Sequence, residues 1–200
     1  MRYGQRAEEQ EIRAASALAK YYGVEWRDVD VSWLGAISRS GLNRKEMLLP
    51  NPSMADLDDL VASEQSKKTV WVCNRNGVFL NIAAAFAEAI GADAILAGFN
   101  KEEAATFPDN SVAYMHALEE SFRFSTELGV KVDSYTKDLT KSDIVIRGLE
   151  LKLPFHLVWS CYESGEKRCW RCESCKRTER ALLSAGAAGA SVLKELGGGS

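Results

Sequence analysis

Four of the five cysteines in this 200-residue chain, Cys161, Cys169, Cys172 and Cys175, lie within fifteen residues of one another. Their spacing, C-x7-C-x2-C-x2-C, contains two overlapping Cys-x-x-Cys turns, and each turn places two thiolates on one side of a tight bend. With a fourth sulfur from Cys161, these ligands can close a tetrahedron around Zn²⁺ at about 2.3 Å per bond. Because no coordination position is left for water, the spacing predicts a structural zinc site rather than a catalytic one.

Other chemistries for this cluster are a thioredoxin-like redox pair, an iron–sulfur cluster and plain burial in the core. Core packing explains four cysteines at this spacing poorly. Basic neighbours would offset the negative charge of a zinc ion held by four thiolates; they are Lys167, Arg168, Arg171, Lys176 and Arg177. The remaining cysteine, Cys73, stands alone in an apolar segment, and we expect it to be a small buried hydrophobe.

The elements that must position such residues follow from the hydrophobic periodicity. Helical spacing predicts helices over residues 5–22, 78–90 and 112–128. A capping-box pattern at Thr140–Asp143 predicts a further helix that closes near Gly148. Apolar or alternating runs predict strands over 24–32, 69–73, 92–99 and 130–135. Strands that alternate with helices indicate an α/β fold, a parallel sheet with helices on both faces.

Ligands of such sheets bind at the carboxyl ends of the strands. Two polar loops follow predicted strands, one at residues 74–76 and one at 100–110, and we expect the functional site there. The irregular connection over 34–68, with a short helix near 54–62, is long for a compact domain. It is expected to be a functional loop or a mobile flap.

Several strings along the chain together resemble one family, the 7-cyano-7-deazaguanine synthases, which make the nitrile precursor of queuosine and archaeosine. The resemblance covers about residues 3–180 and ends in the cysteine cluster, and the order of the strings makes it specific. The strings are Tyr3-Gly-Gln-Arg6, Asn74-Arg-Asn76, Gly98-Phe-Asn-Lys-Glu-Glu103, Thr106-Phe-Pro-Asp-Asn110, Leu139-Thr-Lys141 and Trp159-Ser-Cys-Tyr162.

The resemblance implies an ATP pyrophosphatase (PP-loop) domain, a Rossmann-like α/β fold of the adenine nucleotide alpha hydrolase type. It also implies an ATP-dependent ligase that uses Mg²⁺. Members adenylate the carboxylate of 7-carboxy-7-deazaguanine, and ammonia displaces AMP to give an amide. The amide is adenylated in turn, and elimination of AMP leaves the nitrile. Both steps follow from leaving-group activation, because AMP leaves far more readily than a carboxylate oxygen.

One departure from the family pattern concerns the phosphates of ATP. The family carries a strand, then a Ser-Gly-Gly-x-Asp-Ser loop whose backbone N–H groups cradle pyrophosphate, then a helix and a second strand. No Ser-Gly-Gly string occurs in this sequence. We therefore expect an N-terminally incomplete fold without its first strand-helix-strand unit, either a truncated form or a naturally motif-less relative. The 200 residues as they stand are not expected to bind ATP productively.

The resemblance implies nine residues that bind substrate or nucleotide: Arg75, Asn76, Gly98, Asn100, Glu102, Pro108, Asp109, Asn110 and Lys141. Arg75 could hold a phosphate or carboxylate through two hydrogen bonds. Asp109 could accept the N–H donors on the guanine-like edge of a deazapurine, and Glu102 could hold Mg²⁺ or position ammonia. No residue is assigned as catalytic. Helix caps, turn-forming side chains and solvated charges are the alternative explanations of these positions.

The sequence divides into an α/β nucleotide and substrate domain over 1–160, the zinc site over 161–180, and a C-terminal helix with a flexible tail over 181–200. The chain has 25 basic and 28 acidic side chains, and its net charge of −3 argues against a general nucleic-acid binder. No apolar run is long enough to span a bilayer. These properties predict a cytoplasmic protein with small-molecule substrates and no nucleic-acid or membrane partner. They also allow a homodimer.

Two other functions are compatible with the sequence. A related PP-loop ligase would share the core but transfer to a different acceptor, such as a protein amine. A zinc-stabilised partner subunit would carry no activity, and the missing Ser-Gly-Gly string is its only support. The loop at 100–110 discriminates between the two ligases, because substrate choice is expected to lie there.

Overall fold

The computed structural model of the protein describes residues 1–199, without the side chains of residues 60 and 62. The chain forms two compact units. One unit, here called the sheet unit, runs from Cys73 to Lys141. The other, called the cysteine unit, combines Met1–Val72 with the chain from Ser142 onward.

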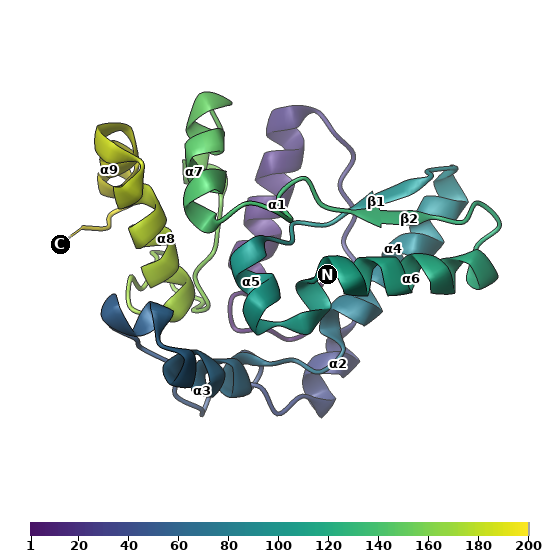
Figure 1. The fold of residues 1–200 in the computed structure, drawn as a ribbon, viewed down its shortest axis with the longest axis horizontal. Helices are drawn as coiled ribbons and strands as arrows, with labels where there is room; N and C mark the ends of the chain where they lie inside the picture. The colour runs from purple at the N-terminus through teal and green to yellow at the C-terminus, as the bar shows by residue number, and fades with distance from the viewer. Residues whose placement is uncertain (200) are drawn as a thin grey trace. The chain divides into compact units, whose positions relative to one another are not determined.

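The sheet unit holds a small parallel sheet, formed by β1 (Ala94–Leu96) and β2 (Lys131–Asp133). The strands lie side by side in Figure 1, with Ile95 opposite Val132. This confirms two predicted strands and their parallel pairing, although each is three residues long in the described structure. The other elements of the unit are α4 (Arg75–Ile90), α5 (Lys101–Thr106), the 3₁₀ turn η2 (Pro108–Asn110) and α6 (Val112–Ser125).

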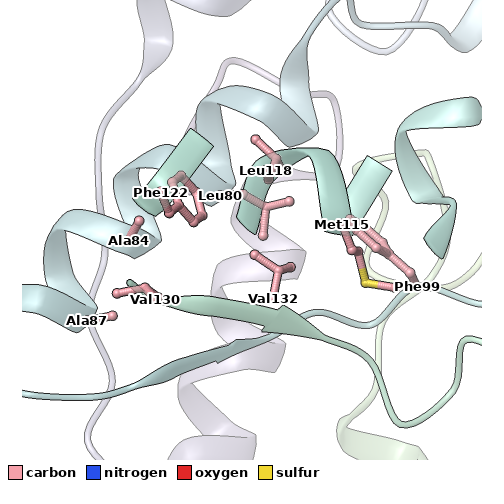
Figure 2. Close-up of a cluster of buried hydrophobic side chains, with 9 residues drawn as sticks. All are labelled: Leu80, Ala84, Ala87, Phe99, Met115, Leu118, Phe122, Val130 and Val132. Atoms are coloured by element: carbon pink, nitrogen blue, oxygen red, sulfur yellow. The ribbon is translucent and has the colours of Figure 1, made fainter. Parts of the chain in front are cut away.

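The core of the sheet unit lies between β2 and the helices α4 and α6 (Figure 2). Its buried side chains are Leu80, Ala84, Ala87, Phe99, Met115, Leu118, Phe122, Val130 and Val132. They recur at helical spacing in α4 and α6, which is why the two predicted helices form where periodicity placed them. The opposite face of the sheet carries Ala94 and Leu96, and Leu96 is 56% exposed. The helices of this unit therefore cover one face of the sheet, where the sequence predicted cover on both.

The cysteine unit is built from helices and turns. Its elements are α1 (Glu8–Tyr22), α2 (Ser32–Ile37), η1 (Ala55–Asp58), α3 (Leu60–Val70), α7 (Lys141–Glu150), η3 (Phe155–Leu157), α8 (Glu173–Ser184) and α9 (Gly186–Glu195). Helix α7 begins at the last residue of the sheet unit. It packs through Val145 against α8 and α9, which contribute Ala181, Leu182 and Leu193 to a shared core.

Two predicted strands are wrong. Residues 69–73 end a helix, since α3 runs to Val70 and the N–H of Trp71 still donates to the Lys67 carbonyl at 2.8 Å. A five-residue apolar run does not distinguish a strand from a buried helix end. Residues 24–32 are largely irregular and make a single parallel bridge between Asp30 and Arg2. The chain turns at Gly4, which has a φ of +73°, so this pairing does not extend.

The predicted flap over 34–68 contains the end of α2, the turn η1 and most of α3. At the other end of the chain, the Gly198 N–H donates to the Leu193 carbonyl at 2.9 Å and closes α9. The predicted tail includes Ser200, which lies outside the described residues. None of the helices in the described part of the chain is long and apolar enough to cross a bilayer.

Candidate functional site

The start of α4 places the first pair of predicted site residues. Asn74 adopts a left-handed backbone with φ of 55°, a conformation that asparagine tolerates better than most residues. Arg75 and Asn76 follow in the first helical turn. The Asn76 side chain is buried, and its Nδ2 donates to the Asp109 carbonyl at 3.5 Å. The helix start is therefore attached to η2, the turn that carries Asp109.

Gly77 has no room for a side chain. A Cβ at this position would overlap the Asn74 Oδ1 and lie 2.7 Å from the Tyr114 hydroxyl. Glycine is thus required for the close approach of α4, the Asn74 turn and α6.

Asp109 lies in η2, which Pro108 opens. Its carboxylate accepts a hydrogen bond from the Asn110 Nδ2 at 3.3 Å. Burial raises the pKa of Asp109, and the nearby charge of Arg75 opposes this rise without cancelling it. The site therefore holds a partly buried carboxylate beside a guanidinium, a pair suited to a ligand that has both N–H donors and negative charge.

Tyr114 is a site residue that sequence reasoning missed. Burial raises the pKa of its hydroxyl, and the charge of Asp109 adds to the rise. Ser111 caps α6, and its Oγ accepts from the Tyr114 N–H at 3.1 Å, which places Tyr114 in the first turn of that helix. The serine cap three residues before the tyrosine was the available signal.

The second group of predicted residues follows β1. Asn100 is buried and caps α5, since its Oδ1 accepts from the Glu103 N–H at 3.0 Å. The Glu102 Oε1 accepts from the Lys141 N–H at 2.9 Å. Both contacts use side chains predicted to bind ligand, so each has a structural role in the described molecule. Gly98 lies exposed at the strand end, where a Cβ would meet no described atom within 4 Å.

The loops that follow the two strands are joined to each other. The Phe99 carbonyl accepts from the Ser134 Oγ at 2.8 Å and from the Thr136 Oγ1 at 2.6 Å. The Lys101 N–H donates to the Leu139 carbonyl at 3.0 Å. All nine predicted residues consequently lie in one unit, at the carboxyl end of the sheet and at the starts of α4 and α7. We call this set the polar-end site.

The cysteine unit brings the four predicted metal ligands together. Their sulfur atoms all lie within 4.8 Å of one another. Cys161, Cys172 and Cys175 are buried and Cys169 is half-buried. Backbone N–H groups point at the sulfurs: those of Glu163 and Cys169 donate to Cys161 at 3.4 Å, and that of Cys172 donates to Cys169 at 3.3 Å. The spacing therefore predicted the gathering of the sulfurs correctly.

The electrostatics of this cluster suit a cation. The pKa of Cys161 is lowered because its sulfur accepts hydrogen bonds from the thiols of Cys172 and Cys175, whose own pKa values are raised. Four convergent sulfurs with backbone N–H donors fit a thiophilic ion such as Zn²⁺. Cys73 does not belong here, and it is exposed rather than buried as predicted.

The Tyr3–Arg6 string has a structural role close to the metal ligands. The Arg6 side chain donates to three carbonyls of one loop, those of Gly41, Arg44 and Met47. It also pairs with Glu163 at 3.5 Å. A cavity of about 470 Å³ lies beside it, with Lys45, Arg171 and Cys172 in its lining.

The fold and these sites define a small α/β protein with polar groups at the end of a parallel sheet and a cluster of four sulfurs that could hold a metal ion. The chain belongs to the family described as queuosine biosynthesis protein QueC, whose family model matches residues 1–186. Three relatives are named 7-cyano-7-deazaguanine synthase. The relative from Bdellovibrio bacteriovorus is 48% identical over 183 residues, 92% of this chain and 79% of that protein. The relative from Desulforudis audaxviator is 48% identical over 92% of this chain and 83% of its own length. The relative from Methanosarcina mazei is 43% identical over 92% of this chain and 81% of its own length.

Proposed function

We propose that this chain serves the reaction for which its relatives are named, the synthesis of 7-cyano-7-deazaguanine. The Ser-Gly-Gly loop expected to cradle pyrophosphate does not occur in its sequence, so the assay below directly tests productive ATP binding by these residues. The substrates are 7-carboxy-7-deazaguanine, ammonia and ATP. The observation that carries the proposal is identity of 43–48% over 92% of the chain to proteins of that name in three organisms. A different acceptor, or a partner subunit without activity, is not favoured by these relatives.

The chemistry is two rounds of activation. The substrate carboxylate attacks the α-phosphorus of ATP and releases pyrophosphate, and ammonia then displaces AMP to form the amide. The amide oxygen attacks a second ATP, again releasing pyrophosphate. Loss of AMP and of the amide protons leaves the carbon–nitrogen triple bond. The protein has to orient the carboxyl carbon, exclude water and stabilise the phosphate charge.

The polar-end site offers groups for these tasks. Arg75 lies in the first turn of a 16-residue helix, where its guanidinium and the helix N-terminus both favour an anion. Lys141 begins α7 and offers a second positive charge. We assign Arg75 and Lys141 to the carboxylate or the phosphates. Asn76, Gly98, Asn100, Pro108 and Asn110 are assigned to shaping the pocket, and Glu102 to Mg²⁺ that accompanies ATP.

Asp109 is assigned to substrate recognition. Its half-buried carboxylate would accept the N–H donors of the guanine-like edge, and Arg75 nearby would face the acidic substituent. A carboxylate that accepts hydrogen bonds from a ligand discriminates strongly against ligands without N–H donors, because such ligands leave the buried acceptor unpaired.

The test supplies the chain with all three substrates and measures the nitrile by mass spectrometry. In parallel, titration calorimetry compares the binding of 7-carboxy-7-deazaguanine to wild type and to Asp109→Asn. We expect about 5- to 150-fold weaker binding for Asp109→Asn, because lost recognition of N–H donors costs about 1–3 kcal/mol. The matched control is Asp138→Asn, an exposed aspartate of the same unit. Equal affinity of the two variants would contradict the role of Asp109, and no nitrile from wild type would contradict the activity.

We propose further that Cys161, Cys169, Cys172 and Cys175 hold a structural Zn²⁺. Support comes from the four sulfurs within 4.8 Å of one another and the three N–H groups that donate to them. A bound metal would cross-link the segment that contains Cys161 to the segment that contains Cys169, Cys172 and Cys175. The chain's own side chains would supply every ligand, so the metal would take no part in the reaction.

The remaining parts of the proposal concern organisation. We propose a nucleotide and substrate part over 1–160, a metal part over 161–180 and a C-terminal part over 181–200. We also propose a cytoplasmic location, small-molecule partners rather than nucleic acid or membrane, and a homodimer. Sedimentation velocity of the purified chain tests the dimer.

A further inference from the structure

Arg168 is a buried cation immediately before a metal ligand. Arg168 is 9% exposed, and its guanidinium contacts two hydrogen-bond acceptors and two aromatic rings. Its Nη1 donates to the Ser160 Oγ at 3.1 Å, and its Nη2 donates to the Val158 carbonyl. Its guanidinium carbon lies 5.4 Å from the centre of the Trp159 ring and 6.0 Å from that of Trp170. The side chain therefore bridges the segment before Cys161 and the turn between Cys169 and Cys172.

Both aromatic rings that face Arg168 are attached to the cysteine cluster. The Trp159 Nε1 donates to the Cys161 carbonyl at 3.0 Å. Trp170 lies inside the Cys169-x-x-Cys172 turn with a φ of 52°, a left-handed conformation that costs a non-glycine residue about 1–2 kcal/mol. The indole packs on the cysteine cluster and on the core of α7, α8 and α9, which offsets this cost.

Arg168 is the buried cation among those around the described cluster. The other cations around the described cluster are exposed or paired: Lys176 pairs with Glu179, Arg177 with Glu173 and Arg6 with Glu163, while Lys167 and Arg171 are exposed. Within residues 1–199, the Arg168 guanidinium contacts a hydroxyl, a carbonyl and two aromatic rings. Its charge interacts with Cys161 and Cys175. Burying a guanidinium is costly unless negative charge lies close, and four thiolates around a divalent ion supply that charge.

We propose that Arg168 is a positioning residue of the metal centre, an internal cation that compensates the thiolates and holds the Cys161 segment against the Cys169–Cys175 turn. This inference rests on the metal site proposed above and goes beyond its four ligands. Loss of the side chain removes the donors to the Ser160 Oγ and the Val158 carbonyl and leaves the sulfurs without an internal counter-charge. Metal would then leave the site faster.

The experiment measures the rate at which zinc passes from the purified full chain to an excess of a chromogenic chelator. For Arg168→Gln we expect release about 10–100-fold faster than for wild type, the range found when outer partners of metal ligands are removed. Arg168→Lys keeps the charge but lacks the planar donor fork, so its rate should lie between the two. Arg171→Gln is the matched control, an exposed arginine of the same turn, and should release zinc at the wild-type rate.

The cobalt-substituted protein provides a second measurement, because the absorption bands of Co²⁺ bound to four thiolates report distortion of the site. If zinc leaves Arg168→Gln and Arg168→Lys as slowly as it leaves Arg171→Gln, the inference is overturned. If Arg168→Gln does not fold, Arg168→Lys decides. A wild-type chain that binds no zinc would overturn the proposed metal centre itself, which is a different result from unchanged release.

Discussion

Asp109 shows how a residue suited to binding can cost stability. Burial raises the pKa of its carboxyl above the ordinary value of 3.8, so the folded protein prefers the protonated form. A folded-state pKa above the unfolded one means that the folded state binds more protons between the two values. The free energy of unfolding therefore decreases as the pH rises through that interval.

Asp109→Asn is expected to remove this pH dependence. At neutral pH the variant should be at least as stable as wild type, because the partly buried negative charge is gone. Below the unfolded pKa the advantage should disappear. Urea denaturation of both proteins between pH 4 and pH 7 provides the measurement. If the difference in stability between wild type and Asp109→Asn stays constant over this range, the pKa of Asp109 is the same in the folded and unfolded states. Weaker substrate binding together with unchanged or higher stability would mark Asp109 as a functional residue.

Gly77 is a residue whose role is purely spatial. Gly77→Ala would drive a methyl group into the Asn74 side chain and against the Tyr114 hydroxyl. Overpacking of this kind costs about 1–3 kcal/mol of stability and should also displace Arg75 and Asn76. Thermal unfolding tests this, with Gly98→Ala as control, since its added methyl group has open space. A Gly77→Ala protein as stable as Gly98→Ala would mean that the Asn74 turn rearranges without cost.

At the scale of elements, charged contacts attach η1 and α3 to α8. Glu173 is buried at the start of α8, accepts from the Ser66 Oγ of α3 and pairs with Arg177 at 2.8 Å. Arg177 donates in turn to the Leu57 carbonyl at 3.3 Å, and Arg180 pairs with Asp58 at 2.8 Å. These contacts hold η1 and α3 against α8.

Glu173→Ala is expected to loosen α3. It removes the carboxylate that the half-buried Arg177 guanidinium and the buried Ser66 hydroxyl share, which costs about 1–3 kcal/mol. Hydrogen exchange should become faster over Leu60–Val70 while α8 itself stays protected. The control is Glu166→Ala, an exposed glutamate in the same unit. Equal exchange in the two variants would mean that apolar contacts alone hold α3.

At the scale of the whole chain, the four-sulfur cluster is able to cross-link the cysteine unit. Cys161 follows η3, while Cys172 and Cys175 lie at the start of α8, so a metal held by these sulfurs would join the two segments. The sheet unit has its own core between β2, α4 and α6 and needs no such link.

Cys172→Ser is expected to lose zinc and to destabilise the cysteine unit, since three thiolates do not complete the tetrahedron. Metal analysis by mass spectrometry and hydrogen exchange provide the measurements. Exchange should rise over the cysteine unit and change little over α4 and α6. Cys73→Ser removes an exposed cysteine and should keep its zinc. A Cys172→Ser protein with full zinc content and wild-type protection would refute the four-sulfur site.

The sequence pattern was sufficient to predict structure where the interacting residues are close to one another in the chain. The cysteine cluster could be predicted because its four sulfurs come from fifteen residues, and the two Cys-x-x-Cys turns bring three of them close. Helices α4 and α6 could be predicted because their apolar periodicity extends over three turns or more. The polar loops at the ends of the strands followed from the rule that parallel strands end at one edge.

Packing between distant segments decided the rest. Residues 69–73 ended a helix because the turn before them was already helical, which a five-residue window does not reveal. The Tyr114 hydroxyl approaches Gly77 because α6 packs beside α4. Cys73 is exposed because the strand expected around it does not form. Arg168 looks like one of five similar cations in the sequence. Its burial depends on where two tryptophans and a carbonyl lie in space, and hydrophobic burial and hydrogen bonding over such separations leave no local pattern in the chain.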